Sequence, residues 1–255
     1  MNTREQNSRK VAFVTGANRG IGFGTALELG RQGVHVILGA RDEASGRKAL
    51  AELAEQDVQA EWLEFNVANA ADHQRAYDFI EQKYGKLDIL VNNAGIMLET
   101  PETEFNQKNT TSVVSGDALR GTFEVNFFGL VGLTQTLLPL IKRAPAGRIV
   151  NVSSVLASLN IHATSDDPRL PNHRQFAYNA SKTAVNAFTI HLAKELAGSS
   201  VKVNAAHPGW VRTDMGGPHA EMSIEEGAAT SVQLALLGDD GPSGSYMHKG
   251  QVLPW

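Results

Sequence analysis

Apolar and polar residues alternate along this chain as short apolar runs separated by longer amphipathic stretches. The apolar runs are rich in β-branched residues, as buried strands are. They occur at residues 10–15, 34–39, 59–67, 87–92, 148–153 and 201–206. Between them, apolar residues recur every three or four positions, which indicates helices. The first predicted helix ends at Arg31. The others cover residues 43–53, 70–84, 117–143 and 177–197.

An unbroken alternation of strand and helix is typical of a doubly wound parallel sheet with helices on both faces. The composition does not change along the chain, and there is no internal repeat or linker. We predict a single α/β domain of the Rossmann type over residues 10–255, with about seven strands, Gln251–Leu253 being the last. Ser223 and Glu226 have the spacing of a capping box and predict a final helix. Residues 1–9 are polar, lack the apolar stretch of a secretory signal and predict a disordered leader.

Composition narrows the classes of function. The chain has 255 residues, 42% of them apolar, which suffices for one large domain with a full core. The net charge is −4 and no basic run exceeds two residues, so neither nucleic acid nor an anionic membrane is an expected partner. Absence of cysteine excludes disulfides, cysteine-ligated zinc and thiol catalysis. We expect a soluble, cytoplasmic protein with a small-molecule substrate; monomer and homo-oligomer both stay open.

The most apolar region, residues 125–141, tests the expectation of a soluble protein. It is interrupted by polar residues and by Pro139. A membrane span needs about 20 consecutive apolar residues, so this region predicts a buried helix. Asn126 lies within it, and a buried amide needs hydrogen-bond partners. It therefore belongs either to a polar network of the core or to a functional site.

A glycine-rich turn follows the first predicted strand. Gly16, Gly20 and Gly22 have the spacing G-x-x-x-G-x-G and open the first helix. The order strand, glycine turn, helix presents backbone N–H groups to a phosphate, and glycines let the pyrophosphate come close. An ordinary tight turn is the alternative, but the position between strand and helix favours a dinucleotide.

The end of the second strand bears on which dinucleotide binds. An acidic residue there accepts a hydrogen bond from a free ribose 2′-hydroxyl, whereas arginine accommodates a 2′-phosphate. Arg41 stands at this end, and Arg19 lies in the glycine turn. Two guanidiniums directed at one phosphate favour NADP over NAD. The neighbouring Asp42 is interpreted as an N-cap or first-turn residue of the helix that follows.

Tyr178 and Lys182 lie four residues apart in a helical pattern, so their side chains share one face. A phenol ionises near pH ~10, and a nearby ammonium lowers that pKa towards the range useful for proton transfer. Most such pairs lie on a solvated surface, and this is the alternative. His191 and Glu195 are also four residues apart, a spacing that suits a metal site. No further ligands accompany them, so they are interpreted as part of a solvated helix face and no metal is expected.

Two further polar clusters end predicted strands. Asn92-Asn93-Ala94-Gly95 follows the fourth strand, and Ser153-Ser154 ends the fifth. Small polar residues at the carboxyl ends of parallel strands suit a ligand cleft, although a plain turn fits the first cluster equally well.

The motifs TGANRGIG, NNAG, VNFFG, NVSS and YNASK occur in this order, and with them the chain resembles a short-chain dehydrogenase/reductase. The resemblance runs from about Lys10 to the C-terminus. The segments LLPLIK, HPGWVRTDMGGP and SIEEGA, together with Trp255, are similar to the carbonyl-reductase branch.

The resemblance implies NADPH-dependent reduction of a ketone, aldehyde or quinone, or the reverse oxidation. Tyr178 would donate the proton, Lys182 would hold the nicotinamide ribose, and Ser154 would donate to the substrate oxygen, with Ser153 left open. Asn126 would position a water on the proton path to Lys182. The residues implied to bind NADP(H) are Gly16, Asn18, Arg19, Gly20, Ile21, Gly22, Arg41, Asn66, Val67, Asn93, Ala94, Gly95, Tyr178, Lys182, Pro208, Val211 and Thr213.

Some features depart from the family pattern. Asn66 stands where the family usually has Asp, although an amide oxygen can still accept from adenine. The interval from Ser154 to Tyr178 is longer than in most members and shorter than in the carbonyl-reductase branch, which leaves the oligomeric state open. Residues 157–175 within it are interpreted as an irregular polar segment.

The loops at residues 96–115, 156–175 and 209–221 would line the substrate pocket. Met97, Phe105, Trp210 and Met215 in these loops suggest an apolar acceptor.

Two other functions fit parts of the pattern. A non-catalytic NADP(H)-binding regulatory protein could use the same fold, since fold does not determine function. Such a protein would be expected to lack the tyrosine or the lysine. A nucleotide-sugar epimerase-like enzyme is the other, but it would carry a longer C-terminal region and a different glycine spacing.

Overall fold

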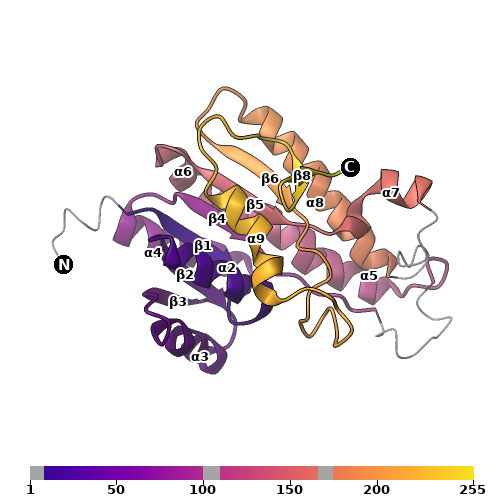
Figure 1. The fold of residues 1–255 in the computed structure, drawn as a ribbon, viewed down its shortest axis with the longest axis horizontal. Helices are drawn as coiled ribbons and strands as arrows, with labels where there is room; N and C mark the ends of the chain where they lie inside the picture. The colour runs from indigo at the N-terminus through magenta and orange to yellow at the C-terminus, as the bar shows by residue number, and fades with distance from the viewer. Residues whose placement is uncertain (1–8, 100–109, 166–174) are drawn as a thin grey trace.

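The computed structural model of the chain describes residues 9–99, 110–165 and 175–255. A central sheet is covered by helices on both faces (Figure 1). Its strand order is β3-β2-β1-β4-β5-β6-β7-β8. The strands are β1 (Val11–Thr15), β2 (His35–Ala40), β3 (Ala60–Glu64), β4 (Ile89–Asn92), β5 (Arg148–Val152), β6 (Lys202–Ala206), β7 (Tyr246–His248) and β8 (Gln251–Val252).

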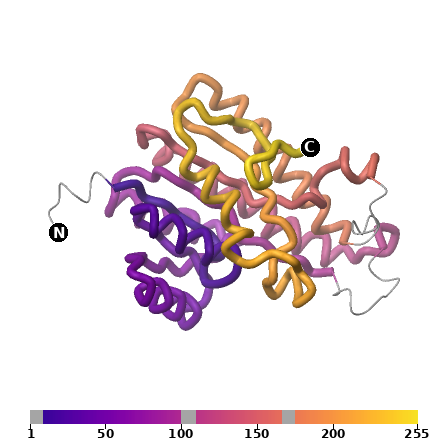
Figure 2. Tube along the Cα trace, in the orientation of Figure 1, coloured from indigo at the N-terminus to yellow at the C-terminus, as the bar shows by residue number. Residues whose placement is uncertain are grey.

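All strand pairs are parallel except β7 with β8. The doubly wound parallel sheet predicted from the sequence is therefore confirmed. The described chain has eight strands rather than about seven, because Tyr246–His248 was not predicted as a strand. This segment is only three residues long, and it is extended because it pairs with β6. In Figure 2 the yellow C-terminal segment lies beside the orange β6.

The helices begin and end close to the predicted positions. They are α2 (Gly20–Arg31), α3 (Glu43–Ala54), α4 (Ala70–Tyr84), α5 (Gly116–Phe123), α6 (Leu130–Arg143), α7 (Leu159–Thr164), α8 (Phe176–Glu195) and α9 (Ile224–Ala235). Two shorter segments are the π-helix η2 (Glu124–Gly129) and the 3-10 helix η3 (Val155–Ala157).

The helix predicted over residues 117–143 is confirmed as one continuous helical segment, Gly116–Arg143, in which a π-helical turn separates α5 from α6. A second prediction was wrong. The segment from Ala157, expected to be irregular, contains α7, because Ser158 caps the Ile161 N–H at 3.1 Å. A six-residue helix is too short to show a clear apolar period.

The sheet separates two apolar cores. Successive side chains of a strand point to opposite faces, so Val11 and Phe13 lie in one core while Ala12 and Val14 lie in the other. Helices α4, α6 and α8 pack in the first core, and α2, α3 and α9 in the second. Both faces are thus buried, which explains why the strands read as continuous apolar runs.

Among the described residues, one helical segment, Gly116–Arg143, is long and apolar enough to cross a membrane by length and composition alone. A buried core helix can be as long and as apolar as a helix that crosses a membrane. Leu133, Leu137 and Leu140 of this segment pack in the first core against the sheet, as the buried-helix interpretation predicted.

Helix caps predicted from the sequence are present. Asp42 is the N-cap of α3, and its carboxylate accepts from the Ser45 N–H at 2.8 Å. Ser223 and Glu226 form a complete capping box at the start of α9. Asp42 is therefore the N-cap of the helix that follows it, as predicted.

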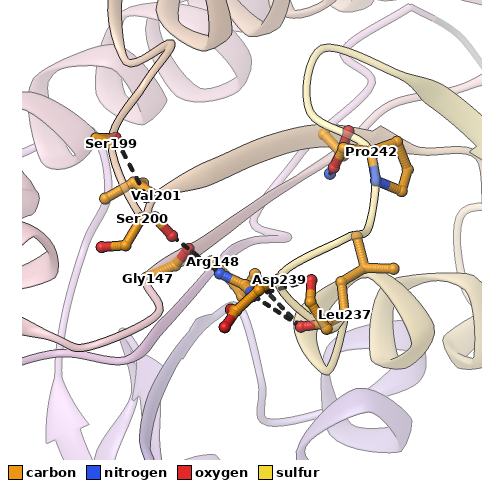
Figure 3. Close-up of polar contacts among 10 residues, drawn as sticks. Gly147, Arg148, Ser199, Ser200, Val201, Leu237, Asp239 and Pro242 are labelled. Carbon is orange, nitrogen blue, oxygen red and sulfur yellow. Dashed lines mark hydrogen bonds and ion pairs between the residues drawn. The ribbon is translucent and has the colours of Figure 1, made fainter.

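A buried arginine joins the ends of the elements opposite the carboxyl edge of the sheet. Arg148, the first residue of β5, donates to the carbonyl oxygens of Ser200 at 3.1 Å and Leu237 at 2.8 Å (Figure 3). It also contacts the carboxylate of Asp239 at 3.3 Å, whose side chain is 91% exposed. Backbone carbonyls are therefore the main partners of this buried charge.

Candidate active site

The site lies at the carboxyl ends of the parallel strands. The strand order reverses direction between β1 and β4. In open α/β sheets, ligands bind outside the carboxyl ends of the strands at such a point. The glycine turn follows β1, Asn93-Ala94-Gly95 follows β4, and Ser153-Ser154 follows β5. Helix α8 passes this edge and carries Tyr178 and Lys182.

The glycine turn has no room for side chains. Gly16 and Gly20 have φ angles of +63° and +56°, which L-residues rarely adopt. A Cβ at Gly22 would lie 2.4 Å from both the Asn93 amide nitrogen and the Gly16 carbonyl oxygen. Helix α2, which begins here, has no side-chain cap. Its N-terminal N–H groups and the bare backbone fit a pyrophosphate.

Asn93 locks this turn to the end of β4. Its side-chain amide donates to Thr15 O at 2.8 Å and Gly16 O at 3.2 Å. In return the Thr15 hydroxyl accepts from the backbone N–H groups of Asn93 and Ala94, both at 3.0 Å. The sequence prediction did not single out Thr15. Its position as the last residue of β1, directly before the glycine turn, was the available signal.

Lys182 is buried and Tyr178 is half-buried at the carboxyl edge of the sheet. Lys182 is 3% exposed, and its ammonium donates to Val152 O at 2.8 Å. The ammonium lies 5.9 Å from the centre of the Tyr178 ring. A Cβ at Gly95 would lie 3.4 Å from both the Lys182 nitrogen and the Asn126 side-chain oxygen. Lys182 and Asn126 therefore lie beside Gly95. The alternative of a solvated surface pair is wrong, because Lys182 is buried.

Burial controls the ionisation of this pair. It raises the pKa of Tyr178, and a hydrogen bond with Ser154 offsets only part of the rise. Burial likewise lowers the pKa of Lys182 to about 8. The expectation of a lowered pKa for Tyr178 is wrong for the protein alone, because desolvation outweighs the hydrogen bond with Ser154. At neutral pH the phenol is protonated, which is the state a proton donor requires.

The two serines that end β5 have different partners. The Ser153 hydroxyl donates to the Asn186 side-chain oxygen at 2.6 Å and is buried in this contact. The Ser154 hydroxyl accepts from the Leu156 N–H at 3.2 Å and hydrogen-bonds with Tyr178. Of the two, Ser154 is the one directed at the tyrosine.

Asn126 belongs to a polar network that reaches the site. Its amide exchanges two hydrogen bonds with the backbone of Ile96, at 2.8 and 2.9 Å. It also donates to the Ser181 hydroxyl at 3.0 Å, and that hydroxyl donates to Tyr178 O at 2.7 Å. The interpretation of Asn126 as part of a buried polar network is confirmed, and this network borders Lys182 at Gly95.

The loop after β6 contacts both the segment that follows β5 and the glycine turn. The ring of His207 accepts from the N–H groups of Val155 and Gly209, at 3.1 and 3.3 Å. Burial, with a smaller contribution from His248, lowers the pKa of His207 to about 3, so the ring stays neutral as an acceptor. Pro208 and Val211 are buried next to this link. The Thr213 methyl group would lie 3.2 Å from a Cβ at Gly20, so the loop contacts the glycine turn.

The residues expected at the adenosine end lie at the ends of β2 and β3. Arg41 is exposed directly after β2. Asn66 accepts from the Ala68 N–H at 3.2 Å through its side-chain oxygen. Val67 is buried, and its carbonyl accepts from the His73 ring at 2.7 Å.

Arg19, which the sequence analysis expects to be directed at the 2′-phosphate, has a protein partner in this structure. Its guanidinium is ion-paired with Asp214 of the loop after β6. Asn18 and Ile21 are half-buried at the same turn.

Three of the four apolar residues expected in the substrate loops lie in the described part of the chain. Trp210 is 52% exposed and Met215 44% exposed, while Met97 is half-buried. Phe105 lies outside the described residues. His191 and Glu195 are solvent-exposed on α8, and the part of the chain that the structure describes holds no group of three or more metal-ligating side chains.

A sequence profile of the short chain dehydrogenase family matches residues 10–223. This chain belongs to the short chain dehydrogenase family. It is 36% identical to carbonyl reductase (NADPH) 1 of Bos taurus, over 98% of this chain and 99% of the relative. Identity to the Homo sapiens protein of the same name is 33%, over 96% and 98%.

Solved structures agree with the family assignment. The NADPH-bound carbonyl reductase from chicken fatty liver superposes with a TM-score of 0.82 at 26% identity, covering 97% of this chain and 99% of that one. Salutaridine reductase from Papaver somniferum gives a TM-score of 0.78 at 28% identity, covering 94% and 100%.

In this short chain dehydrogenase the buried ammonium of Lys182 is expected to reduce stability at neutral pH. Burial lowers the pKa of Lys182 from 10.5 in the unfolded chain to about 8 in the folded protein. The free energy of unfolding is therefore highest above pH 10.5, where the lysine is neutral in both states, and it decreases as the pH falls through 8. Lys182→Met should raise the free energy of unfolding at pH 7 by about 1–2 kcal/mol. The full linkage is ~3 kcal/mol, but methionine also loses the hydrogen bond to Val152 O.

Urea unfolding at pH 7 and at about pH 9.5 measures this effect. The gain should shrink by at least half at the higher pH, because the wild-type lysine is then neutral in the folded state. Lys194→Met, at an exposed position of the same helix, is the control and should change stability little. A Lys182→Met protein less stable than wild type at pH 7 would contradict the prediction.

Proposed function

We propose that this protein is an NADP(H)-dependent oxidoreductase that reduces a ketone, aldehyde or quinone carbonyl to the alcohol, or catalyses the reverse reaction. The observation that carries the proposal is that Tyr178 hydrogen-bonds with Ser154 and lies 5.9 Å from the Lys182 ammonium, which borders Gly95 at the end of β4. The relatives named carbonyl reductase (NADPH) 1 and the NADPH-bound structural neighbour support the choice of cofactor.

The cofactor would lie along the carboxyl edge of the sheet. The turn at Gly16, Gly20 and Gly22 would hold the pyrophosphate on its N–H groups, with Asn93 keeping the turn in place. The adenosine end would lie near Asn66 and Val67. The nicotinamide end would lie near Gly95 and the loop that carries Pro208, Val211 and Thr213. NADPH, when bound, supplies the hydride.

The side chains of the protein would supply the proton and stabilise the developing alkoxide. Tyr178 would donate its phenolic proton to the substrate oxygen, and Ser154 would donate a hydrogen bond to the same oxygen. Lys182 would hold the ribose hydroxyls and place a positive charge near the phenol. Asn126 keeps the segment at Ile96 in place beside this set.

Substrate recognition would be apolar in character. Trp210 and Met215 present exposed apolar surface on the loop after β6, which supports an aromatic or otherwise apolar carbonyl compound. An NADPH oxidation screen of the purified protein against quinones, aldehydes and ketones tests the proposal. Binding of NADPH without turnover of any of these compounds would favour the non-catalytic regulatory protein instead.

Arg41 is proposed to select NADPH through the 2′-phosphate. Arg41→Asp is expected to weaken NADPH binding by about 10- to 100-fold, because it replaces a charge-assisted hydrogen bond with repulsion. NADH affinity should change less than about threefold. Fluorescence titration of both cofactors measures the two dissociation constants.

Arg47→Asp is a suitable control, since it makes the same charge change on α3 where Arg47 pairs with Glu43. It should leave the ratio of the two affinities near that of wild type. An unchanged ratio in Arg41→Asp would assign the 2′-phosphate to other residues.

A further inference from the structure

Helix α8 begins without a cap of its own. Its N-cap residue, Gln175, has a left-handed φ of 64° and no side-chain hydrogen bond to the first turn. The first turn of a helix has N–H groups without partners inside the helix, and an anion satisfies them best. Tyr178 lies in this first turn, so the way these N–H groups are satisfied determines where its backbone lies.

A glutamate from a distant segment satisfies them. The Glu99 carboxylate accepts from the Ala177 N–H at 2.6 Å and from the Tyr178 N–H at 3.1 Å, one with each oxygen. Glu99 is only 6% exposed and lies 78 residues before Ala177 in the chain. Burial raises the pKa of this carboxyl group, while the two N–H donors oppose the rise.

The backbone carbonyl of Tyr178 is linked to the same segment at Ile96, through two side chains. Ser181 donates to Tyr178 O at 2.7 Å and accepts from Asn126 at 3.0 Å. Asn126 in turn exchanges two hydrogen bonds with the backbone of Ile96. Residues 96–99 are therefore linked directly to the N–H of Tyr178, and indirectly, through Asn126 and Ser181, to its C=O. They directly follow Gly95, against which Lys182 lies.

We propose that Glu99 is a positioning residue for the proton donor, tying the backbone of Tyr178 to the segment that leaves the cofactor-facing end of β4. The proposal rests on the function proposed above for Tyr178. A local cap at Gln175 would order the helix just as well, but it would not couple the helix to residues 93–96. A displacement of about 1 Å at a reacting group can cost ~10²-fold in rate, so this coupling matters for catalysis more than for cofactor binding.

Glu99→Gln is the decisive variant, because it keeps the shape and replaces one accepting oxygen with an NH2 group that faces a backbone N–H. With the carbonyl compound turned over fastest in the screen, kcat is expected to fall at least ~10-fold. The NADPH dissociation constant should stay within about twofold, since the glycine turn is untouched. Proton delivery from a displaced phenol should also raise the solvent isotope effect on kcat.

Glu226→Gln is the matched control. Glu226 also accepts from a backbone N–H at a helix start, that of Ser223 at 2.8 Å, but on α9 and away from Tyr178. It should leave kcat unchanged. Glu99→Ala is the second variant, and it should lower kcat further, with far-UV circular dichroism and NADPH fluorescence reporting the fold.

The outcomes separate the two proposals. A kcat within about twofold of wild type in Glu99→Gln overturns the positioning role. So does a fall in kcat matched by an equal loss of NADPH affinity, which would mean a general loosening. If Tyr178→Phe retains turnover, the proposed function itself is wrong and the positioning role falls with it. Loss in Tyr178→Phe with none in Glu99→Gln overturns only the positioning role.

Discussion

Tyr178→Phe is expected to lower kcat at least ~100-fold while NADPH affinity stays within about twofold. The change removes one hydroxyl, which is the proposed proton donor to the substrate oxygen, and general acid catalysis commonly contributes a factor of this size. The ring that remains still fills its place in α8. Steady-state turnover with the best substrate of the carbonyl screen, together with fluorescence titration of NADPH, measures the two quantities.

Tyr77→Phe provides the control for removing a tyrosine hydroxyl. Tyr77 donates to Glu81 at 3.2 Å on α4, far from the carboxyl edge of the sheet. Its loss should leave turnover unchanged. Near-normal turnover in Tyr178→Phe would refute the assignment of the proton donor, and a loss caused by failed cofactor binding would be seen directly in the titration.

Arg148→Met is expected to lower the free energy of unfolding by about 3–5 kcal/mol. The guanidinium donates to the carbonyl oxygens of Gly147, Ser200, Leu237 and Gly238 at 2.8–3.2 Å, and its side chain is 3% exposed. Methionine fills part of the volume but makes none of these hydrogen bonds. The carbonyls of Gly147 and Gly238 keep the N–H groups of Lys202 and Gly241, whereas the partly buried contacts to Ser200 and Leu237 are lost. A hydrogen bond to a charged group contributes about 1.5–3 kcal/mol. Urea unfolding at pH 7 measures the difference.

Asp239→Asn separates this effect from that of the ion pair. Because the Asp239 side chain is 91% exposed, its pair with Arg148 should contribute less than about 1 kcal/mol. Below the unfolding transition both variants should retain wild-type kcat, since Arg148 begins β5 and the proposed site lies beyond its other end. A loss of stability in Asp239→Asn as large as in Arg148→Met would assign the stabilisation to the pair.

The proposed catalytic pair is held in an environment that opposes its charges. Burial raises the pKa of Tyr178 and lowers that of Lys182. Both pKa shifts favour the neutral form of the group. The phenol of Tyr178 is therefore protonated at neutral pH, whereas burial destabilises the charged form of Lys182. Sites of this kind commonly trade stability for activity, which is why Lys182→Met is expected to stabilise a protein that it would inactivate.

Local patterns were sufficient for much of the fold. The strand runs, the glycine turn, the Asp42 cap and the capping box at Ser223 all depend on residues within a few positions of one another. The shared face of Tyr178 and Lys182 follows from helical geometry alone. Element order and short connections then leave a doubly wound parallel sheet as the arrangement that buries both faces.

The sequence by itself therefore determined the order of the elements, the sheet, the family motifs and the edge where they meet. The tertiary structure alone decided which serine faces Tyr178, that Arg19 pairs with Asp214, and that Glu99 caps the helix of the proton donor. It also decided the pKa of Tyr178, since burial is a property of the packed protein. These contacts join residues tens or hundreds of positions apart, and no local periodicity encodes a distance across the folded chain.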